Sequence, residues 1–311
     1  MLPSAPLHPL NLAWLRQAGI DVAVLRLDLI DPLISGNKWF KLTHHLAAAR
    51  QAGAEGVISL GGAHSNHLHA LAAAGKRFGF CTVGLLRGHP AQTPTVLDLQ
   101  AFGMQLHWLG YAGYRARHEA GFWLPWRERY PRLYPIPEGG GGLDGALGCA
   151  DIVNQVRRQL GTLGWEDYHG WWLACGTGTT LAGLVLAEEG LRPVYGAMAL
   201  PEGHGIAGNV ADILGPLDNP RYQLFDASRG GFAKVDDDLL AFIAASEQES
   251  GVPLEPLYTG KALLALRQAV MAGRFAKGTR LIFVHTGGLQ GKRQGNTHPL
   301  GNDRPLSRGC F

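Results

Sequence analysis

The chain alternates between short apolar runs and amphipathic segments over most of its 311 residues. Short apolar runs that end in glycine indicate strands buried on both faces, and apolar side chains that recur every three or four residues indicate helices. The predicted strands are 56–62, 80–86, 105–110, 170–176, 194–200 and 279–288. The predicted helices are 39–53, 65–79, 96–103, 146–160, 179–190, 237–251 and 260–273.

Strands that alternate with helices predict a parallel sheet with crossover helices. The alternation runs twice, and the glycine-rich stretch LYPIPEGGGG separates the two runs. We therefore expect two α/β domains. The polar tail from residue 291 to residue 311 is rich in glycine and proline, so we expect it to loop over the surface or to be disordered.

Composition narrows the class of protein. The net charge is only +3 and basic residues form no run, which does not favour nucleic acid as a partner. No apolar run approaches the roughly 20 residues that span a bilayer, and prolines interrupt the N-terminus, so we expect no membrane segment and no signal peptide. The cysteines form no CxxC pair, which predicts free thiols in a reducing cytoplasm rather than disulfides or a zinc site. They are Cys81, Cys149, Cys175 and Cys310.

The first chemically unusual strand end is SLGGAHSNH, in which Ser65 and Asn66 fall at the start of a helix. Backbone N–H groups are unpaired there, so the two residues could form an ordinary N-cap or could bind a ligand. His64, His67 and His69 invite a metal hypothesis. Their spacing does not place all three on one helical face, and the HExxH pattern is absent, so we predict no metal.

The second such strand end is CGTGTTLAG, with glycines and hydroxyls between an apolar strand and an apolar helix. Backbone N–H groups and the helix dipole at such a junction favour an anion, so residues Gly176 to Thr180 indicate a phosphate site. No Gly-Lys-Ser/Thr follows, which excludes a Walker A loop. The GxGxxG pattern and its acidic partner are also absent, so a nicotinamide-dependent dehydrogenase is a distant alternative.

Taken singly, the other short blocks GNKWFKL, PLYTGKAL and FVHTGG are compatible with a surface lysine, a helix cap and a strand end. In their order along the chain, together with SLGGAHSNH, GLDGALG and CGTGTTLAG, they resemble a known family. The sequence is similar to the D-cysteine desulfhydrase and 1-aminocyclopropane-1-carboxylate deaminase family of pyridoxal-phosphate enzymes. The resemblance covers nearly the whole chain.

The fold that this resemblance implies is α/β, with two open, mainly parallel three-layer domains like those of the tryptophan synthase β-subunit (fold type II). Residues 1–41 and 151–311 would form the large cofactor-binding domain, and residues 42–150 the smaller one. The family is usually dimeric, so a homodimer is expected, and a small amino acid is the expected substrate.

The resemblance also implies roles for single residues. Lys38 would hold pyridoxal phosphate as a Schiff base, and the apolar residues after it suit the partly desolvated amine that such a role needs. The cofactor would also contact Asn66, Cys175, Gly176, Thr177, Gly178, Thr179, Thr180, Thr259 and Thr286. Catalysis would use Lys38, Ser65 and Tyr258, with the Cα base left open among them. Ser65, Asn66 and His67 would bind the substrate carboxylate.

Two positions bear on the substrate. The resemblance places Thr259 and Thr286 where the desulfhydrases have neutral hydroxyls and the deaminases differ, which favours β-elimination from D-cysteine. Phe232 stands near the family's second active-site tyrosine, and the polar stretch LQGKRQ follows the final glycines. A 1-aminocyclopropane-1-carboxylate deaminase, another lyase or racemase on the same cofactor, and a non-catalytic cofactor-binding protein remain the alternatives.

Overall fold

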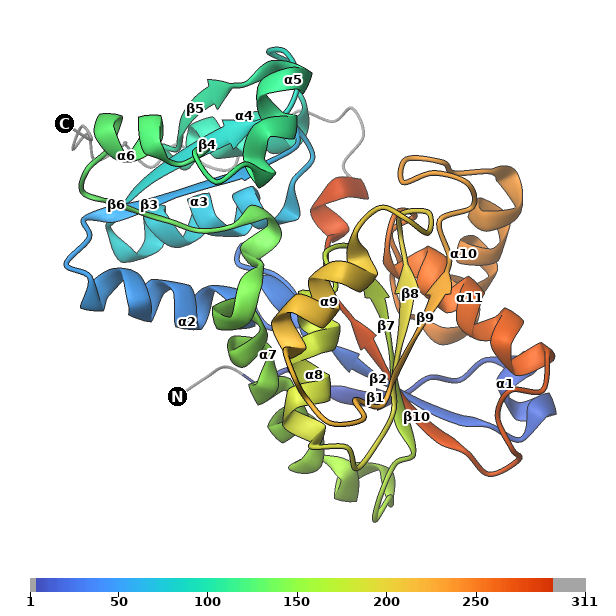
Figure 1. Cartoon of the computed structure of the whole chain (residues 1–311). Coiled ribbons are helices and arrows are strands. Elements are labelled where there is room, and N and C mark those ends of the chain that lie inside the picture. The colour runs from blue at the N-terminus through green and yellow to red at the C-terminus, as the bar shows by residue number, and fades with distance from the viewer. Residues whose placement is uncertain (1–3, 293–311) are drawn as a thin grey trace. The chain divides into compact units, whose positions relative to one another are not determined.

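The computed structural model describes residues 4–292, which form two compact units (Figure 1). Unit 1 comprises residues 4–41 and Gly142–Leu289, and unit 2 comprises Leu42–Gly141 with residues 290–292. The expected domain limit at residue 150 falls inside α7 (Gly142–Arg157). This helix packs along its length against α8 (Thr179–Glu188) in unit 1, so residues 142–150 group with unit 1 rather than with the smaller unit.

Unit 1 is built on a six-stranded sheet in which only β1 is antiparallel to its neighbour. In spatial order its strands are β1 (Leu7–Pro9), β2 (Asp21–Arg26), β10 (Arg280–His285), β7 (Gly170–Cys175), β8 (Val194–Met198) and β9 (Tyr222–Asp226). Its remaining helices are α1 (Ala13–Ala18), α9 (Ile206–Leu214), α10 (Asp237–Ser250) and α11 (Thr259–Met271). The first residues of α2 (Asn37–Gln51) also belong to it.

Helices cover both faces of this sheet (Figure 1). Alternate strand residues enter two separate cores, as the period-2 geometry of a strand requires. Trp171 packs with α7, α8 and α9, whereas the next residue, Trp172, packs with α1, α10 and α11. Unit 1 is therefore a three-layer α/β structure with a mainly parallel sheet, as predicted.

Unit 2 has a four-stranded parallel sheet. Its strands in spatial order are β5 (Gln105–Trp108), β4 (Cys81–Leu86), β3 (Gly56–Gly61) and β6 (Leu133–Pro135). Its helices are α3 (Asn66–Phe78), α4 (Pro94–Ala101), α5 (Gly110–Arg115) and α6 (Leu124–Arg129). Ile58, Leu60, Val83 and Leu85 form its core with Tyr114, so the glycine-bounded strands are buried as their apolar runs predict.

The sequence pattern did not identify β1, β2, β6 and β9. β1 and β6 are three residues long and end in proline, and β9 is an edge strand with exposed positions. β2 is almost wholly buried but ends in Arg26 rather than in a glycine. None of the four is an apolar run that ends in glycine, which is the pattern that indicated most of the other strands.

Within the described residues, no helix is both long and apolar enough to cross a membrane. Cys81, Cys149 and Cys175 are free thiols. Cys310 and most of the polar tail lie outside the described residues, so the expectation of a loose surface tail stays a prediction.

Candidate active site

Lys38 lies at the start of α2, immediately after a backbone turn at Gly36. Gly36 has φ 71°, and a Cβ atom there would lie 2.0 Å from the carbonyl oxygen of Thr286. Only glycine allows this close approach. The N–H of Asn37 donates to the same carbonyl at 3.2 Å, so the start of α2 is fastened to the end of β10. This contact fixes Lys38 beside the strand end that carries Thr286.

The amine of Lys38 is held in an unusual environment. Its side chain is half-buried, and desolvation, followed by the nearby positive charge of Lys41, holds its pKa well below the ordinary lysine value. Its Nζ donates to Oδ1 of Asn37 at 3.3 Å, and Nδ2 of Asn37 donates to Oγ1 of Thr180 at 2.8 Å. One buried amide thus links the predicted anchor lysine to the predicted phosphate loop.

The predicted phosphate loop, residues 176–180, begins directly after β7 and runs into the start of α8. Gly178 is the N-cap of α8, and the hydroxyls of Thr177 and Thr179 are 2.9 Å apart. Cys175 contributes little chemistry of its own. Its sulfur packs toward Gly196 of β8, and burial raises the pKa of its thiol to about 12. Cys175 is therefore neutral, and only its backbone continues into the loop.

Lys41 is a charged residue at this loop that the sequence analysis missed. It is 3 % exposed, and its Nζ donates to Oγ1 of Thr177 at 3.4 Å. Burial lowers its pKa, although the nearby thiols of Cys149 and Cys175 oppose this effect. A bound anion would favour the protonated amine. The only sequence signal was its position three residues after Lys38, on the same side of a helix.

Tyr258 lies over the first glycine of the loop, at the N-cap of α11. A Cβ atom on Gly176 would lie 3.1 Å from Cε1 of Tyr258, which is tighter than most Cβ contacts in proteins. The lack of a side chain at Gly176 therefore allows the tyrosine ring to come this close. On its other side the ring meets Phe232 edge-on, with centroids 5.4 Å apart. The structure therefore brings together the predicted tyrosine and the predicted phosphate loop.

The hydroxyl of Thr259 is hydrogen-bonded to the buried residue Glu255. Its Oγ1 accepts the N–H of Glu255 at 2.9 Å and lies 3.2 Å from Oε1 of the same residue. Glu255 also accepts the N–H groups of Leu257, Tyr258 and Thr259, although burial raises its pKa. The Thr259 hydroxyl is thus committed to the start of α11, whereas Thr286 lies half-buried at the end of β10.

A buried ionic network lies under Thr286. Arg26 forms two hydrogen bonds with Asp28, at 2.9 and 2.6 Å, and Oδ1 of Asp28 is 3.2 Å from Nδ1 of His285. Nε2 of His285 donates to the carbonyl oxygen of Pro253 at 2.7 Å. Burial lowers the pKa of His285, against the opposing effect of Asp28. The network ties the ends of β2 and β10 together directly before Thr286.

Ser65, Asn66 and His67 lie together at the start of α3 in unit 2. Ser65 is the N-cap, and its hydroxyl accepts the N–H of Leu68 at 3.2 Å. Oδ1 of Asn66 accepts a hydrogen bond from Nε2 of Gln290 at 2.6 Å. The ring of His67 is buried and 2.8 Å from the hydroxyl of Ser59. His67 could therefore meet a carboxylate only through its backbone.

The histidines of α3 have polar partners in unit 2 other than a metal. His69 contacts Asp98 at 3.1 Å, as His67 contacts Ser59. Across residues 4–292, no group of three or more histidine, cysteine or acidic side chains is arranged to hold a metal ion.

The residues of unit 1 suit a ligand with a phosphate and an aldehyde. A buried cation, two hydroxyls and the N-terminus of α8 meet at Thr177, which is the donor set that a phosphate needs. A lysine with a lowered pKa stands one hydrogen-bonded amide away, and an uncharged amine is what attack on an aldehyde requires. Pyridoxal phosphate has both groups.

Comparisons with known proteins point to the same cofactor. The family model described as pyridoxal-phosphate dependent enzyme matches residues 4–287. A Pyrococcus horikoshii protein that carries the provisional name 1-aminocyclopropane-1-carboxylate deaminase is 30% identical, over 89% of this chain and 87% of its own. The Arabidopsis thaliana mitochondrial bifunctional D-cysteine desulfhydrase/1-aminocyclopropane-1-carboxylate deaminase is 26% identical, over 92% and 76%. The crystal structure of an ACC deaminase homologue has a TM-score of 0.80 at 29% identity, covering 94% and 91%.

Proposed function

Because the chain belongs to the family of pyridoxal-phosphate dependent enzymes, we propose that it is a D-cysteine desulfhydrase. The proposed reaction eliminates the β-substituent of D-cysteine and gives pyruvate, ammonia and sulfide. The enzyme is a pyridoxal-phosphate-dependent lyase of the group that includes D-cysteine desulfhydrases and 1-aminocyclopropane-1-carboxylate deaminases. The choice of D-cysteine within that group is the proposal.

The observation that carries this choice is that the residue after β10, Thr286, carries a hydroxyl rather than a carboxylate. Thr286 offers a hydroxyl there, and the carboxylate of Glu255 is occupied by backbone N–H groups and by Thr259. A hydroxyl leaves a pyridine nitrogen less protonated than a carboxylate does, and the ring is then a weaker electron sink. Elimination tolerates a weaker sink because the departing thiolate removes the charge, whereas opening of a cyclopropane ring has no such leaving group.

When bound, the cofactor supplies an electron sink for the carbanion formed at Cα. The chain's own residues would do the rest. Lys41, Thr177 and Thr179 would hold the phosphate, and the amide of Asn37 would keep the freed Lys38 amine within reach. Lys38 has the lowered pKa that suits a base near neutral pH.

The bond changes balance without an oxidant or a reductant. The Cα–H bond breaks and its proton passes to Lys38, Tyr258 or Ser65. The Cβ–S bond then breaks, and the thiolate leaves with the electron pair and takes up a proton to give sulfide. The remaining 2-aminoacrylate reacts with water to give pyruvate and ammonia.

The test is a panel of D- and L-amino acids, together with 1-aminocyclopropane-1-carboxylate, on the cofactor-loaded protein. Pyruvate, 2-oxobutyrate and sulfide would be measured separately. We expect pyruvate and sulfide in equal amounts from D-cysteine, and neither product from a Lys38→Ala variant. Production of 2-oxobutyrate from the cyclopropane substrate at a higher kcat/KM would overturn the choice.

Two alternatives correspond to other results of the same panel. The names of the relatives favour 1-aminocyclopropane-1-carboxylate as the second candidate substrate. The family's second tyrosine would fall near Phe232, and its absence there favours a protein that binds the cofactor without turnover. If borohydride fixes the cofactor to Lys38 and no amino acid gives a product, the protein binds the cofactor without turnover.

A further inference from the structure

Lys261 is a buried lysine whose ammonium group donates three hydrogen bonds to the backbone of one loop. It lies on the first turn of α11 and is 2 % exposed. Its Nζ donates to the carbonyl oxygens of Ser228, Gly231 and Phe232, each at 2.9 Å. An ammonium has three N–H donors, so all of them meet residues 228–232. We call this segment the Phe232 loop.

Other contacts fix the two ends of the Phe232 loop. Before it, the carboxylate of Asp226 accepts the N–H of Ser228 at 2.8 Å. After it, Asp236 caps α10 and pairs with Arg229 at 2.5 Å. Arg229 has φ 58°, and a non-glycine residue is strained in this left-handed region. Such a conformation persists where the surroundings impose it.

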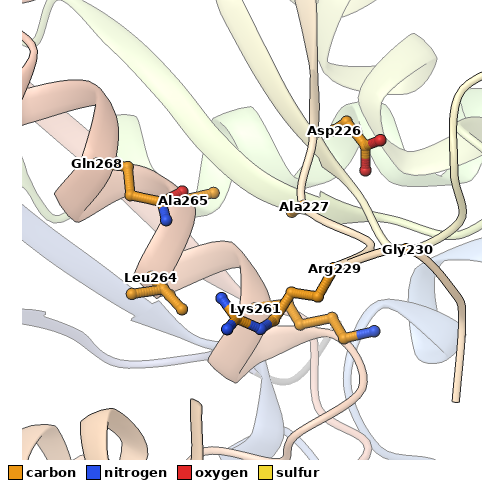
Figure 2. A pocket seen from close by; sticks show the side chains of 8 residues that line it. All are labelled: Asp226, Ala227, Arg229, Gly230, Lys261, Leu264, Ala265 and Gln268. Carbon is orange, nitrogen blue, oxygen red and sulfur yellow. The ribbon is translucent and has the colours of Figure 1, made fainter. Parts of the chain in front are cut away.

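A pocket lies beside the middle of the Phe232 loop. A cavity of about 290 Å³ lies between the loop and α11 (Figure 2). Residues of the loop region and of α11 line it, and Figure 2 shows Lys261 among them. Beside this pocket, the three hydrogen bonds of Lys261 join the loop to α11 and add to the aspartate contacts at its two ends.

The position of the loop determines what lies beside Tyr258. Phe232 contacts the Tyr258 ring edge-on at 5.4 Å, and that ring in turn lies over Gly176 of the phosphate loop. Edge-to-face ring pairs of this kind have a preferred geometry. A displacement of the Phe232 loop would therefore remove one wall of the tyrosine's surroundings.

We propose that Lys261 is a positioning residue and Phe232 a specificity-determining residue of this enzyme. Lys261 holds the loop so that Phe232 closes one side of Tyr258 with an apolar ring edge. This wall admits small β-substituted amino acids and excludes those with long or charged side chains. The inference rests on the proposed function, because it takes Tyr258 to be next to the substrate.

The role of Lys261 is tested by Lys261→Met in the cofactor-loaded protein. Lys234→Met is the matched control, since Lys234 is an exposed lysine just after the same loop. We expect faster hydrogen exchange in peptides covering 228–232, and a kcat/KM for D-cysteine lower by about 100-fold, the size expected for a misplaced catalytic group. The cofactor absorbance should be unchanged. Lys261→Arg, which keeps the charge but not the geometry, should give an intermediate exchange rate.

The role of Phe232 is tested by Phe232→Leu, which shortens the wall and leaves the loop's carbonyl groups in place. We expect the ratio of kcat/KM between a bulky D-amino acid and D-cysteine to rise by about tenfold, the scale that a few methylene groups give in an apolar pocket. Loop exchange should match wild type. Wild-type exchange and wild-type kcat/KM in Lys261→Met, or an unchanged ratio in Phe232→Leu, would overturn the inference.

The exchange measurement separates this inference from the proposed function. If no amino acid is turned over, the proposed function fails, and so does the specificity role of Phe232. The hydrogen exchange of the loop still decides whether Lys261 holds it.

Discussion

At the scale of single residues, Lys41 contacts the predicted phosphate loop through Thr177, and its charge adds to the desolvation that lowers the pKa of Lys38. Removing its charge in Lys41→Met should raise the pKa of Lys38, because a neighbouring positive charge lowers it. Lys38 would then be more protonated at neutral pH and would react more slowly with a small aldehyde. The measurement is the rate of borohydride trapping against pH in cofactor-free protein. The profile should move to higher pH in Lys41→Met and stay near wild type in Lys41→Arg.

The two threonines near the expected pyridine nitrogen should differ in what they support. Thr259→Val leaves the buried N–H of Glu255 without its acceptor, which should cost about 1–3 kcal/mol of unfolding free energy. Thr286→Val should change that free energy little and lower kcat instead. Urea unfolding and steady-state kinetics on both variants check this. A Thr259→Val variant that loses kcat but no stability would mean that Thr259, not Thr286, meets the cofactor.

At the scale of elements, the start of α11 brings Tyr258, Thr259 and Lys261 into one turn, and Glu255 holds that turn. Glu255→Ala leaves three N–H groups without an acceptor, so unfolding free energy should fall by about 2 kcal/mol or more. Because Tyr258 moves with the turn, kcat/KM should fall too.

The matched control for this cap is Thr93→Ala, which removes the side-chain cap of α4 in unit 2. It should cost about 1 kcal/mol of stability and leave kcat/KM near wild type. An equal loss of kcat/KM in both variants would show that general destabilisation, rather than the position of α11, accounts for the effect.

At the scale of unit 1 as a whole, stability and chemistry lie at opposite ends of the sheet. The predicted phosphate loop follows the carboxyl end of β7. Glu188, the last residue of α8, is fully buried and lies beside Trp171 near the start of β7. The Glu188 carboxylate accepts hydrogen bonds from the hydroxyl of Tyr168 and, at 2.7 Å, from the indole of Trp171. It also pairs with two guanidinium groups, those of Arg157 and Arg192.

Removing this carboxylate should therefore weaken the fold without touching the cofactor. Glu188→Ala leaves buried donors unpaired and should cost about 3–5 kcal/mol. Asp167→Ala removes an exposed partner of Arg192 and an acceptor of the Tyr168 N–H, and should cost about 1 kcal/mol, well below the loss in Glu188→Ala. Urea unfolding followed beside cofactor absorbance checks both. Loss of cofactor affinity in folded Glu188→Ala would contradict the separation of the two ends.

Much of the fold could be predicted from the sequence, because it depends on local signals, whereas the roles of the site residues stay predictions. Glycine-bounded apolar runs predicted the central strands. The order of short blocks predicts Lys38 as the cofactor anchor and residues 176–180 as the phosphate loop, and the structure links the two through Asn37. Burial set by distant segments could not be predicted in this way. Lys41 and Lys261 look like surface lysines in the sequence, and only the packed structure shows them 3 % and 2 % exposed. The orientation of the Thr259 hydroxyl depends likewise on Glu255, which no local pattern marks.

The two successive tryptophans of β7, Trp171 and Trp172, are fluorescent groups that lie in different helix layers of unit 1. Trp171 donates its indole N–H to a carboxylate on the side of α8, and Trp172 donates to the carbonyl oxygen of Ala262 in α11. Their fluorescence should therefore report separately on the layer behind the phosphate loop and on the layer that carries Tyr258 and Lys261. Because the chain has six other tryptophans, the signal of each β7 tryptophan is obtained as the difference between wild type and Trp171→Phe or Trp172→Phe. Loosening of the α11 layer during turnover could then be seen in real time.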